Sequence, residues 1–116
     1  MIRIDAIWLC TSPMDMRAGI DSALSRVVHL FGSARVHHAY LFANRRTTRM
    51  KILVHDGQGL WLLQRRLHQG GFVWPQATAS AAAGAEPIVL NLVQWQALTL
   101  GLPWQRLAGD GAIRVA

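Results

Sequence analysis

The sequence predicts an α+β fold: a small, mainly antiparallel sheet with one long N-terminal helix packed on a face and a short C-terminal helix. Three observations lead to this prediction. One segment in the middle of the chain alternates apolar and polar residues, and an Asp-Gly turn joins it to a second strand-like segment, which is typical of an antiparallel hairpin. An apolar stripe at helical spacing precedes them, and a helix-capping pattern follows near the C-terminus. With 116 residues, 52% of them hydrophobic, the chain is expected to form a single domain over residues 1–116.

The N-terminal part is expected to be a strand followed by the long helix. Residues 2–9 are mostly apolar and rich in isoleucine, as in a strand. Ser12, Pro13 and Asp15 match a helix start, with serine as the N-cap, proline at the first helical position and Asp15 in the place of a capping box. Gly32 would end the helix in a left-handed conformation. The stripe expected to face the sheet consists of Met16, Ile20, Leu24, Val27 and Phe31.

Three further strands are predicted over residues 39–43, 49–56 and 60–67. In the middle one, alternation places Met50, Ile52 and Val54 on one face, and we expect them to pack against the helix stripe. Arg49, Lys51, Leu53 and His55 would then lie on the opposite face, with Arg49 and Lys51 pointing outward. A short helix is the alternative for residues 60–67, because Leu60, Leu63 and Leu67 also fit a helical period.

The C-terminal part divides into a loop and a strand/helix segment. Residues 76–86 are rich in Ala, Ser and Thr and lie between two prolines, so a mobile loop is predicted there. Residues 88–104 form the C-terminal strand/helix segment. In it, Asn91 and Gln94 have the spacing of a capping box that opens a short helix, and Gly101 and Pro103 would close it.

The charge of the chain indicates an anionic partner. The formal net charge is +6 and the pI is near 11.4, which is typical of proteins that bind nucleic acid. A GC-rich genome can also enrich arginine, which supplies eleven of the twelve cations. Six cations gather between residues 44 and 75 beside one acid, Asp56. The candidate DNA-binding residues are therefore Arg45, Arg46, Arg49, Lys51, Arg65 and Arg66.

These cations are expected to contact phosphates, and little base readout is expected from a sheet face that lacks Asn and Gln. Like charges on neighbouring strands repel one another, and phosphates would neutralise them. The structural alternative is a solvated, charged face that prevents edge-to-edge aggregation of the sheet.

No catalytic, metal or cofactor site is predicted. A two-metal site needs carboxylates that converge from several strands, and Asp15 and Asp56 already have expected local roles in a cap and a turn. Some single-strand nucleases hold a metal with two histidines on one face of a strand, two residues apart, beside a tyrosine nucleophile. His37 and His38 lie near Tyr40, but adjacent residues on a strand point to opposite faces, so this spacing is wrong for such a site. The lone cysteine, Cys10, is expected to be a buried packing residue.

A cytoplasmic location is expected. One cysteine excludes an internal disulfide and agrees with a reducing compartment. The N-terminus lacks the features of a signal peptide, and no apolar run reaches the ~20 residues of a membrane-spanning helix.

Several motifs in one order resemble the TnpB accessory proteins of the IS66 family of insertion sequences, which are distinct from the RNA-guided nuclease of the same name. They are PMDMRAGID at 13–21, FxNRRxxRxKIL at 42–53, DGxGxWL at 56–62, RL at 66–67 and FxWP at 72–75. The Ala-rich stretch at 76–85 departs from the shorter connection expected in the family.

The resemblance implies an accessory role in transposition beside a separate transposase that carries the catalytic carboxylates. It supplies no active site and no cofactor. The expected partners are DNA, through its phosphate backbone, and the transposase and other proteins of the same element, and a homo-oligomer is compatible with the sequence. Two hypotheses stay open: a DNA-binding accessory factor, and a protein-interaction module that bridges or stabilises the transposase without touching DNA.

Overall fold

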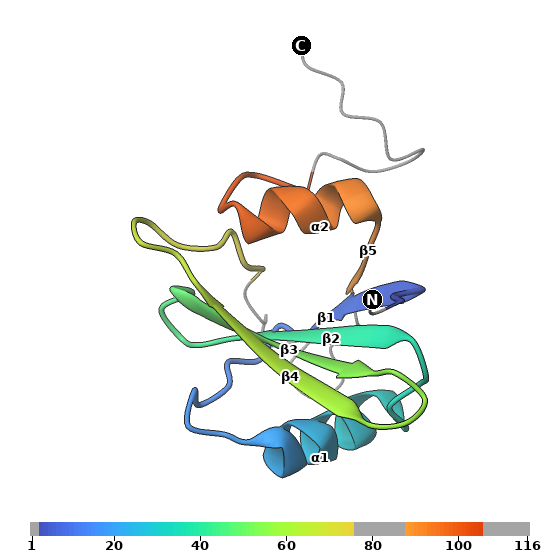
Figure 1. The fold of residues 1–116 in the computed structure, drawn as a ribbon. Helices are drawn as coiled ribbons and strands as arrows, with labels where there is room; N and C mark the ends of the chain where they lie inside the picture. The colour runs from blue at the N-terminus through green and yellow to red at the C-terminus, as the bar shows by residue number, and fades with distance from the viewer. Residues whose placement is uncertain (1–2, 76–87, 106–116) are drawn as a thin grey trace.

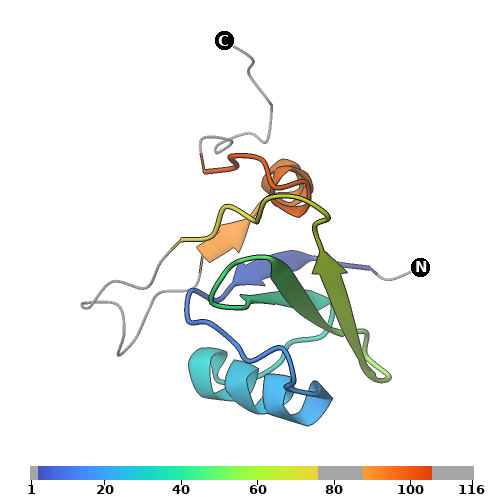
Figure 2. The same ribbon diagram turned by 90° about the vertical axis from the view of Figure 1, so that its left-hand side faces the viewer.

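A five-stranded sheet lies between two helices, one on each face (Figures 1 and 2). The computed structural model describes residues 3–75 and 88–105, so the stretch at 76–86 predicted to be a mobile loop falls outside the described residues. The strand order is β4-β3-β2-β1-β5; β1 and β2 are parallel and the other neighbours are antiparallel. The predicted α+β class is confirmed. The elements are β1 (Ala6–Leu9), α1 (Ile20–Phe31), β2 (His38–Ala43), β3 (Arg49–His55), β4 (Leu60–Arg66), β5 (Ile88–Leu90) and α2 (Leu92–Thr99).

Helix α1 begins later than the sequence pattern predicts. Its N-cap is Gly19, and no side chain caps it, so the helix start predicted at Ser12 is wrong. The backbone N–H of Met14 instead donates to the Ala43 carbonyl at the end of β2 (2.8 Å). The Asp15 carboxylate accepts from the backbone N–H of Arg17 (2.9 Å) and closes a local turn. Residues 13–19 therefore form a separate segment that lies against the end of β2.

The two faces of the sheet carry separate cores, and the predicted packing of α1 is wrong. Helix α1 packs on the face that carries Tyr40, Phe42 and Leu53. The expected partners of α1 lie on the other face, together with Leu98 of α2 and Trp104: these are Met50, Ile52 and Val54. Because both faces of the sheet are covered, every residue from Met50 to Val54 is buried and alternation does not mark a solvent side.

The predicted stripe of α1 reaches the core only in part. Val27 is fully buried, whereas Leu24 and Phe31 are half-buried and Ile20 is exposed. The ring of Phe31 lies 5.0 Å from that of Tyr40 and 5.6 Å from that of Trp8, measured between ring centroids. The C-terminal end of α1 thus covers the sheet through the ring of Phe31.

Two local patterns are confirmed in detail. In the turn between β3 and β4, the Asp56 carboxylate accepts from the backbone N–H groups of Gln58 (2.8 Å) and Gly59 (2.7 Å), and β4 is a strand. At the start of α2, the Asn91 side chain accepts from the Gln94 N–H (2.7 Å), while the Gln94 side chain accepts from the Asn91 N–H (3.0 Å). Neither helix of the described chain is long and apolar enough to cross a bilayer.

Candidate nucleic-acid interface

The turn between β2 and β3 projects two arginines into solvent. The Asn44 side chain shapes this turn: its oxygen accepts from the backbone N–H groups of Thr48 (2.9 Å) and Arg49 (3.1 Å). With these bonds inside the turn, the side chains of Arg45 and Arg46 stay exposed. Both guanidinium groups are free to meet a ligand without disturbing the strands.

The register of the hairpin brings two more arginines together. Arg49 at the start of β3 lies directly opposite Arg66 at the end of β4, so their side chains share the face of the sheet that carries α1. Like charges in opposite positions of an antiparallel pair are destabilising. Gln64 lies on the same face, opposite Lys51, so the expectation of a face without Asn or Gln is wrong.

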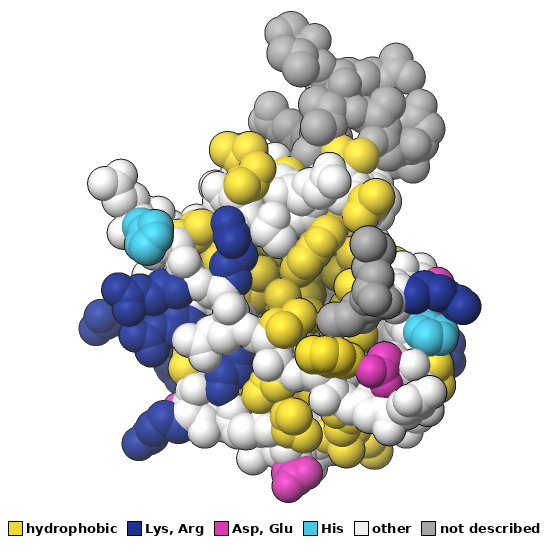
Figure 3. All heavy atoms as spheres, in the orientation of Figure 1, with side chains coloured by type: hydrophobic (Ala, Val, Ile, Leu, Met, Phe, Trp, Pro, Cys, Tyr) yellow, Lys and Arg dark blue, Asp and Glu magenta, His cyan; other side chains and the backbone are white. Residues whose placement is uncertain are grey.

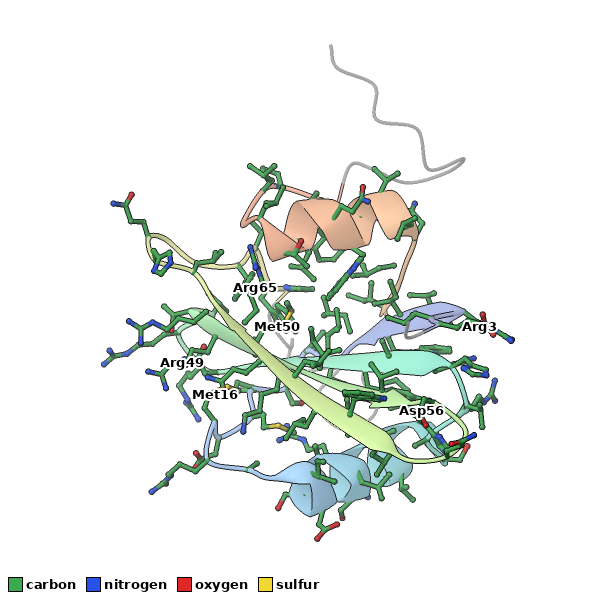
Figure 4. All side chains as sticks on the ribbon, in the orientation of Figure 1. Arg3, Met16, Arg49, Met50, Asp56 and Arg65 are labelled. Atoms are coloured by element: carbon green, nitrogen blue, oxygen red, sulfur yellow. The ribbon has the colours of Figure 1, made fainter. Side chains whose placement is uncertain are left out.

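Arg65 belongs to the other face. It lies opposite Met50, and its Nε donates to the carbonyl oxygen of Thr99 at the end of α2 (2.6 Å) (Figure 4). A cation at the C-terminal end of a helix meets the negative end of the helix dipole. Arg65 therefore holds α2 onto the sheet, and the structure separates it from Arg49 and Arg66.

Lys51 is buried, and the expectation that it points outward is wrong. Its side chain is 6% exposed, and Nζ donates to the backbone carbonyl of Ala18. Residues 13–19 cover the face on which alternation placed Lys51. Lys51 consequently anchors this segment to β3 and presents no surface to a ligand.

The segment over Lys51 brings in an arginine that sequence reasoning did not select. Arg17 pairs with Asp15 (2.9 Å), and Asp15 lines a cavity of about 440 Å³ together with Arg45, Arg46 and Arg49. A second cavity of about 490 Å³ is also bordered by Arg45 and Arg46, and by Trp74. The turn that carries Arg45 and Arg46 thus borders both cavities.

One end of the molecule is therefore strongly basic (Figure 3). We call it the arginine end. It consists of Arg17, Arg45, Arg46, Arg49 and Arg66.

Little negative charge balances the arginine end. Within residues 3–75 and 88–105, the ion pairs are Arg17–Asp15 and Arg3–Asp5, so the other four arginines of this end have no carboxylate partner there. Hydrogen bonds from Arg17 lower the pKa of Asp15 to about 2, and the charge of Lys51 acts in the same direction. Asp15 is thus ionised at neutral pH and offsets a single charge.

Several of the groups that could perform chemistry have structural roles. The Tyr40 hydroxyl accepts from the Arg35 N–H (2.9 Å), and His38 Nδ1 accepts from the indole of Trp8 (2.8 Å). Burial raises the pKa of the Cys10 thiol. In the described part of the chain, no three His, Cys, Asp or Glu side chains come together as metal ligands.

Comparison with known proteins places the chain in a family. Residues 5–109 match the model of the IS66 Orf2-like proteins. The chain belongs to the IS66 Orf2-like family. Membership implies an accessory role for an insertion sequence, and the family is not a known catalytic one. The match extends through α2.

Two relatives come from Sinorhizobium fredii. The uncharacterized protein y4hO is 31% identical over 100 residues, which cover 85% of this chain and 82% of the relative. The uncharacterized protein y4jC is 27% identical over 106 residues, which cover 87% of this chain and 82% of the relative. No solved structure matches the chain.

Proposed function

We propose that this protein is a non-catalytic accessory factor of transposition that binds the phosphate backbone of DNA through the arginine end. The observation that carries the proposal is the register of Arg49 and Arg66. These like charges lie directly opposite each other, with no carboxylate paired to either one in the described residues. Such an arrangement costs a free monomer stability and is offset when phosphates occupy it.

The arginine end favours phosphate contact over base readout. Arg45 and Arg46 are exposed on a turn, where long side chains can follow a phosphate backbone. The Asn44 amide is engaged within that turn. Gln64 is then the amide left on this face for a base edge, so binding is expected to depend weakly on DNA sequence.

Other features of the chain fit the same role. Catalysis would belong to a separate transposase, and this protein would act in the cytoplasm, where the DNA of a bacterial element lies. The proposed role needs no metal and no cofactor. Of the six residues predicted from the sequence, four would contact DNA together with Arg17, and two have structural roles. The four are Arg45, Arg46, Arg49 and Arg66, and the two are Arg65 and Lys51.

A protein-interaction module is the second candidate, because leucines around α2 are unusually exposed. Leu92 is 65% exposed, Leu100 is 61% exposed and Leu102 is 50% exposed. Exposed apolar patches are typical of protein contacts. These leucines lie at the start of α2 and just after its end, on the opposite face of the sheet from α1 (Figure 1), and in this second candidate they would contact the transposase without any contact to DNA.

A gel-shift assay with purified full-length protein tests the proposal. The probes are duplexes from the end of the element and unrelated duplexes of equal length. We expect both to shift at similar protein concentrations and the shift to vanish at high salt. No shift with either probe, together with capture of the element's transposase in a pull-down, would decide for the interaction module.

A further inference from the structure

Strand β4 forms one edge of the sheet (Figures 1 and 2). Its hydrogen-bond pattern with β3 determines which of its backbone N–H and C=O groups point outward. The N–H of Asp56 donates to the carbonyl of Gly59 (3.1 Å), which makes this pair hydrogen-bonded. Bonded and non-bonded pairs alternate in an antiparallel ladder. Trp61, Leu63 and Arg65 therefore bond to β3.

The remaining β4 residues direct their N–H and C=O groups away from β3. They are Leu60, Leu62, Gln64 and Arg66. The β2 side of the sheet agrees with this assignment, because the Asn44 N–H donates to the carbonyl of Arg49 (3.1 Å), an odd-numbered residue of β3 that turns away from β4. In the described chain, the outward backbone groups of β4 have no hydrogen-bond partner.

We propose that β4 pairs antiparallel with β4 of a second copy, about a twofold axis at Leu63, and joins the two sheets edge to edge. Only even-numbered residues offer outward backbone groups, so they must meet even-numbered residues of the second copy. The register centred on Leu63 does this and pairs all 7 residues of β4. Leu60 then lies opposite Arg66 of the second copy, and Leu62 opposite Gln64. Shifting the strands by two residues leaves part of each strand unpaired.

The side chains on the α2 side of β4 fit this register. Leu63, which is 40% exposed, meets its own copy across the axis in a non-hydrogen-bonded pair, where side chains approach most closely. Trp61, which is 47% exposed, comes to lie opposite Arg65 of the second copy. Arg65 is already held by the Thr99 carbonyl, so its guanidinium is ordered for a cation–π contact with the indole.

Charge does not oppose the pairing. Arginines on an edge strand commonly prevent edge-to-edge association, but in this register each of them meets a leucine or a tryptophan and none meets an arginine. The twofold axis is perpendicular to the sheet, so both α1 helices lie on the same side of the joined sheet. The two arginine ends lie at opposite ends of the paired strands and could engage one DNA duplex at two points.

Cysteine cross-linking without DNA tests the register. Across a non-hydrogen-bonded pair the Cα atoms lie about 4.5 Å apart, within the range of a disulfide, so Leu63→Cys is expected to form a covalent dimer under mild oxidation. Gln64→Cys is the matched control on the same strand. Its two copies would lie about 7–8 Å apart diagonally and should remain monomeric on a non-reducing gel. Buried Cys10 is common to both variants. Absence of the Leu63→Cys dimer, or equal cross-linking of Gln64→Cys, would overturn the proposal.

Sedimentation equilibrium tests the association itself. The wild-type protein is expected to be a dimer. Gln64→Pro removes an outward N–H and leaves the bonds to β3 intact, as proline does on sheet edges, so this variant should be a monomer with an unchanged circular dichroism spectrum. Gln64→Thr keeps the N–H and should remain dimeric. A wild-type monomer at the highest soluble concentration would contradict the dimer and would indicate that the arginines of β4 prevent edge-to-edge association. Because DNA is absent, that outcome would leave the proposed DNA binding untouched. If Gln64→Pro fails to fold, the cysteine pair still decides.

Discussion

Lys51 shows how a single covering segment changes the role of a charged residue. Period-two alternation correctly places Lys51 on the same face as Arg49, because the strand geometry is local. Alternation does not reveal that residues 13–19 cross over this face, since that contact depends on a hydrogen bond from the Met14 N–H to the distant Ala43 carbonyl. Arg49, at the rim, keeps its access to solvent, whereas Lys51 is enclosed.

The first prediction contrasts these two residues. Lys51→Glu would bury a carboxylate against the carbonyl of Ala18, and we expect the free energy of unfolding to fall by about 3–5 kcal/mol. Arg49→Glu has no buried partner to lose and should change it by about 0.5 kcal/mol or less. Urea denaturation followed by circular dichroism measures both. Equal stability of the two variants would contradict the anchoring role of Lys51.

The second prediction concerns acid stability. Hydrogen bonds from Arg17 lower the pKa of Asp15 from 3.8 to about 2 in the folded protein. A carboxyl group whose folded pKa is depressed stabilises the fold above its unfolded pKa, and this contribution is lost as the pH falls through the folded value. The melting temperature should therefore decline between about pH 4 and pH 2. In Asp15→Asn this decline should be smaller, and an unchanged profile would argue against the Asp15–Arg17 pair.

At the scale of elements, local patterns were predicted well and long-range packing was not. The capping box of α2 and the Asp56 turn were predictable because each forms from residues within a few positions of one another. The start of α1 was not, since Ser12 and Pro13 have the composition of a helix start but stand where the segment that reaches β2 begins. Both sheet faces are apolar, so the face that receives α1 could not be read from β3 alone.

The third prediction follows from the observed packing of α1. Leu53 is fully buried on the face that carries α1, and Leu53→Ala is expected to cost about 2–5 kcal/mol of unfolding free energy. Leu24, from the predicted stripe, is half-buried, so Leu24→Ala should cost clearly less than that. Chemical denaturation of the two variants compares them directly. A larger cost at Leu24 than at Leu53 would contradict the observed packing of α1.

At the scale of the whole molecule, the hairpin register explains why much of the arginine end could be predicted. The turn at Asp56 fixes which residues of β3 and β4 meet, and so brings Arg49 and Arg66 together. Arg17 joins them through tertiary structure, in a segment that was expected to be helical. Arg65 lies on the other face, where it donates a hydrogen bond to the carbonyl of Thr99 at the end of α2.

The fourth prediction concerns catalysis. Because the proposed role leaves strand cleavage to the transposase, purified protein incubated with Mg²⁺ or Mn²⁺ and element-end DNA should leave both strands uncut on a denaturing gel. Heat-treated protein serves as the control. Nicking that disappears in Asp56→Asn or Tyr40→Phe would restore an enzymatic function.

The salt dependence of DNA binding tests the central claim most directly. Each neutralised phosphate contributes about −0.9 to the slope of log affinity against log salt, so four or five contacts at the arginine end predict a slope of about −4.

Arg49→Gln combined with Arg66→Gln should weaken binding to all sequences and make the slope shallower by about 2. Stability should be maintained or rise, because a like-charge pair is removed. Arg3→Gln, at the opposite end of the molecule (Figure 4), is the control for one lost charge and should leave the slope unchanged. An unchanged slope in the Arg49/Arg66 double variant, with binding as tight as that of the wild type, would contradict the assignment of the arginine end to DNA.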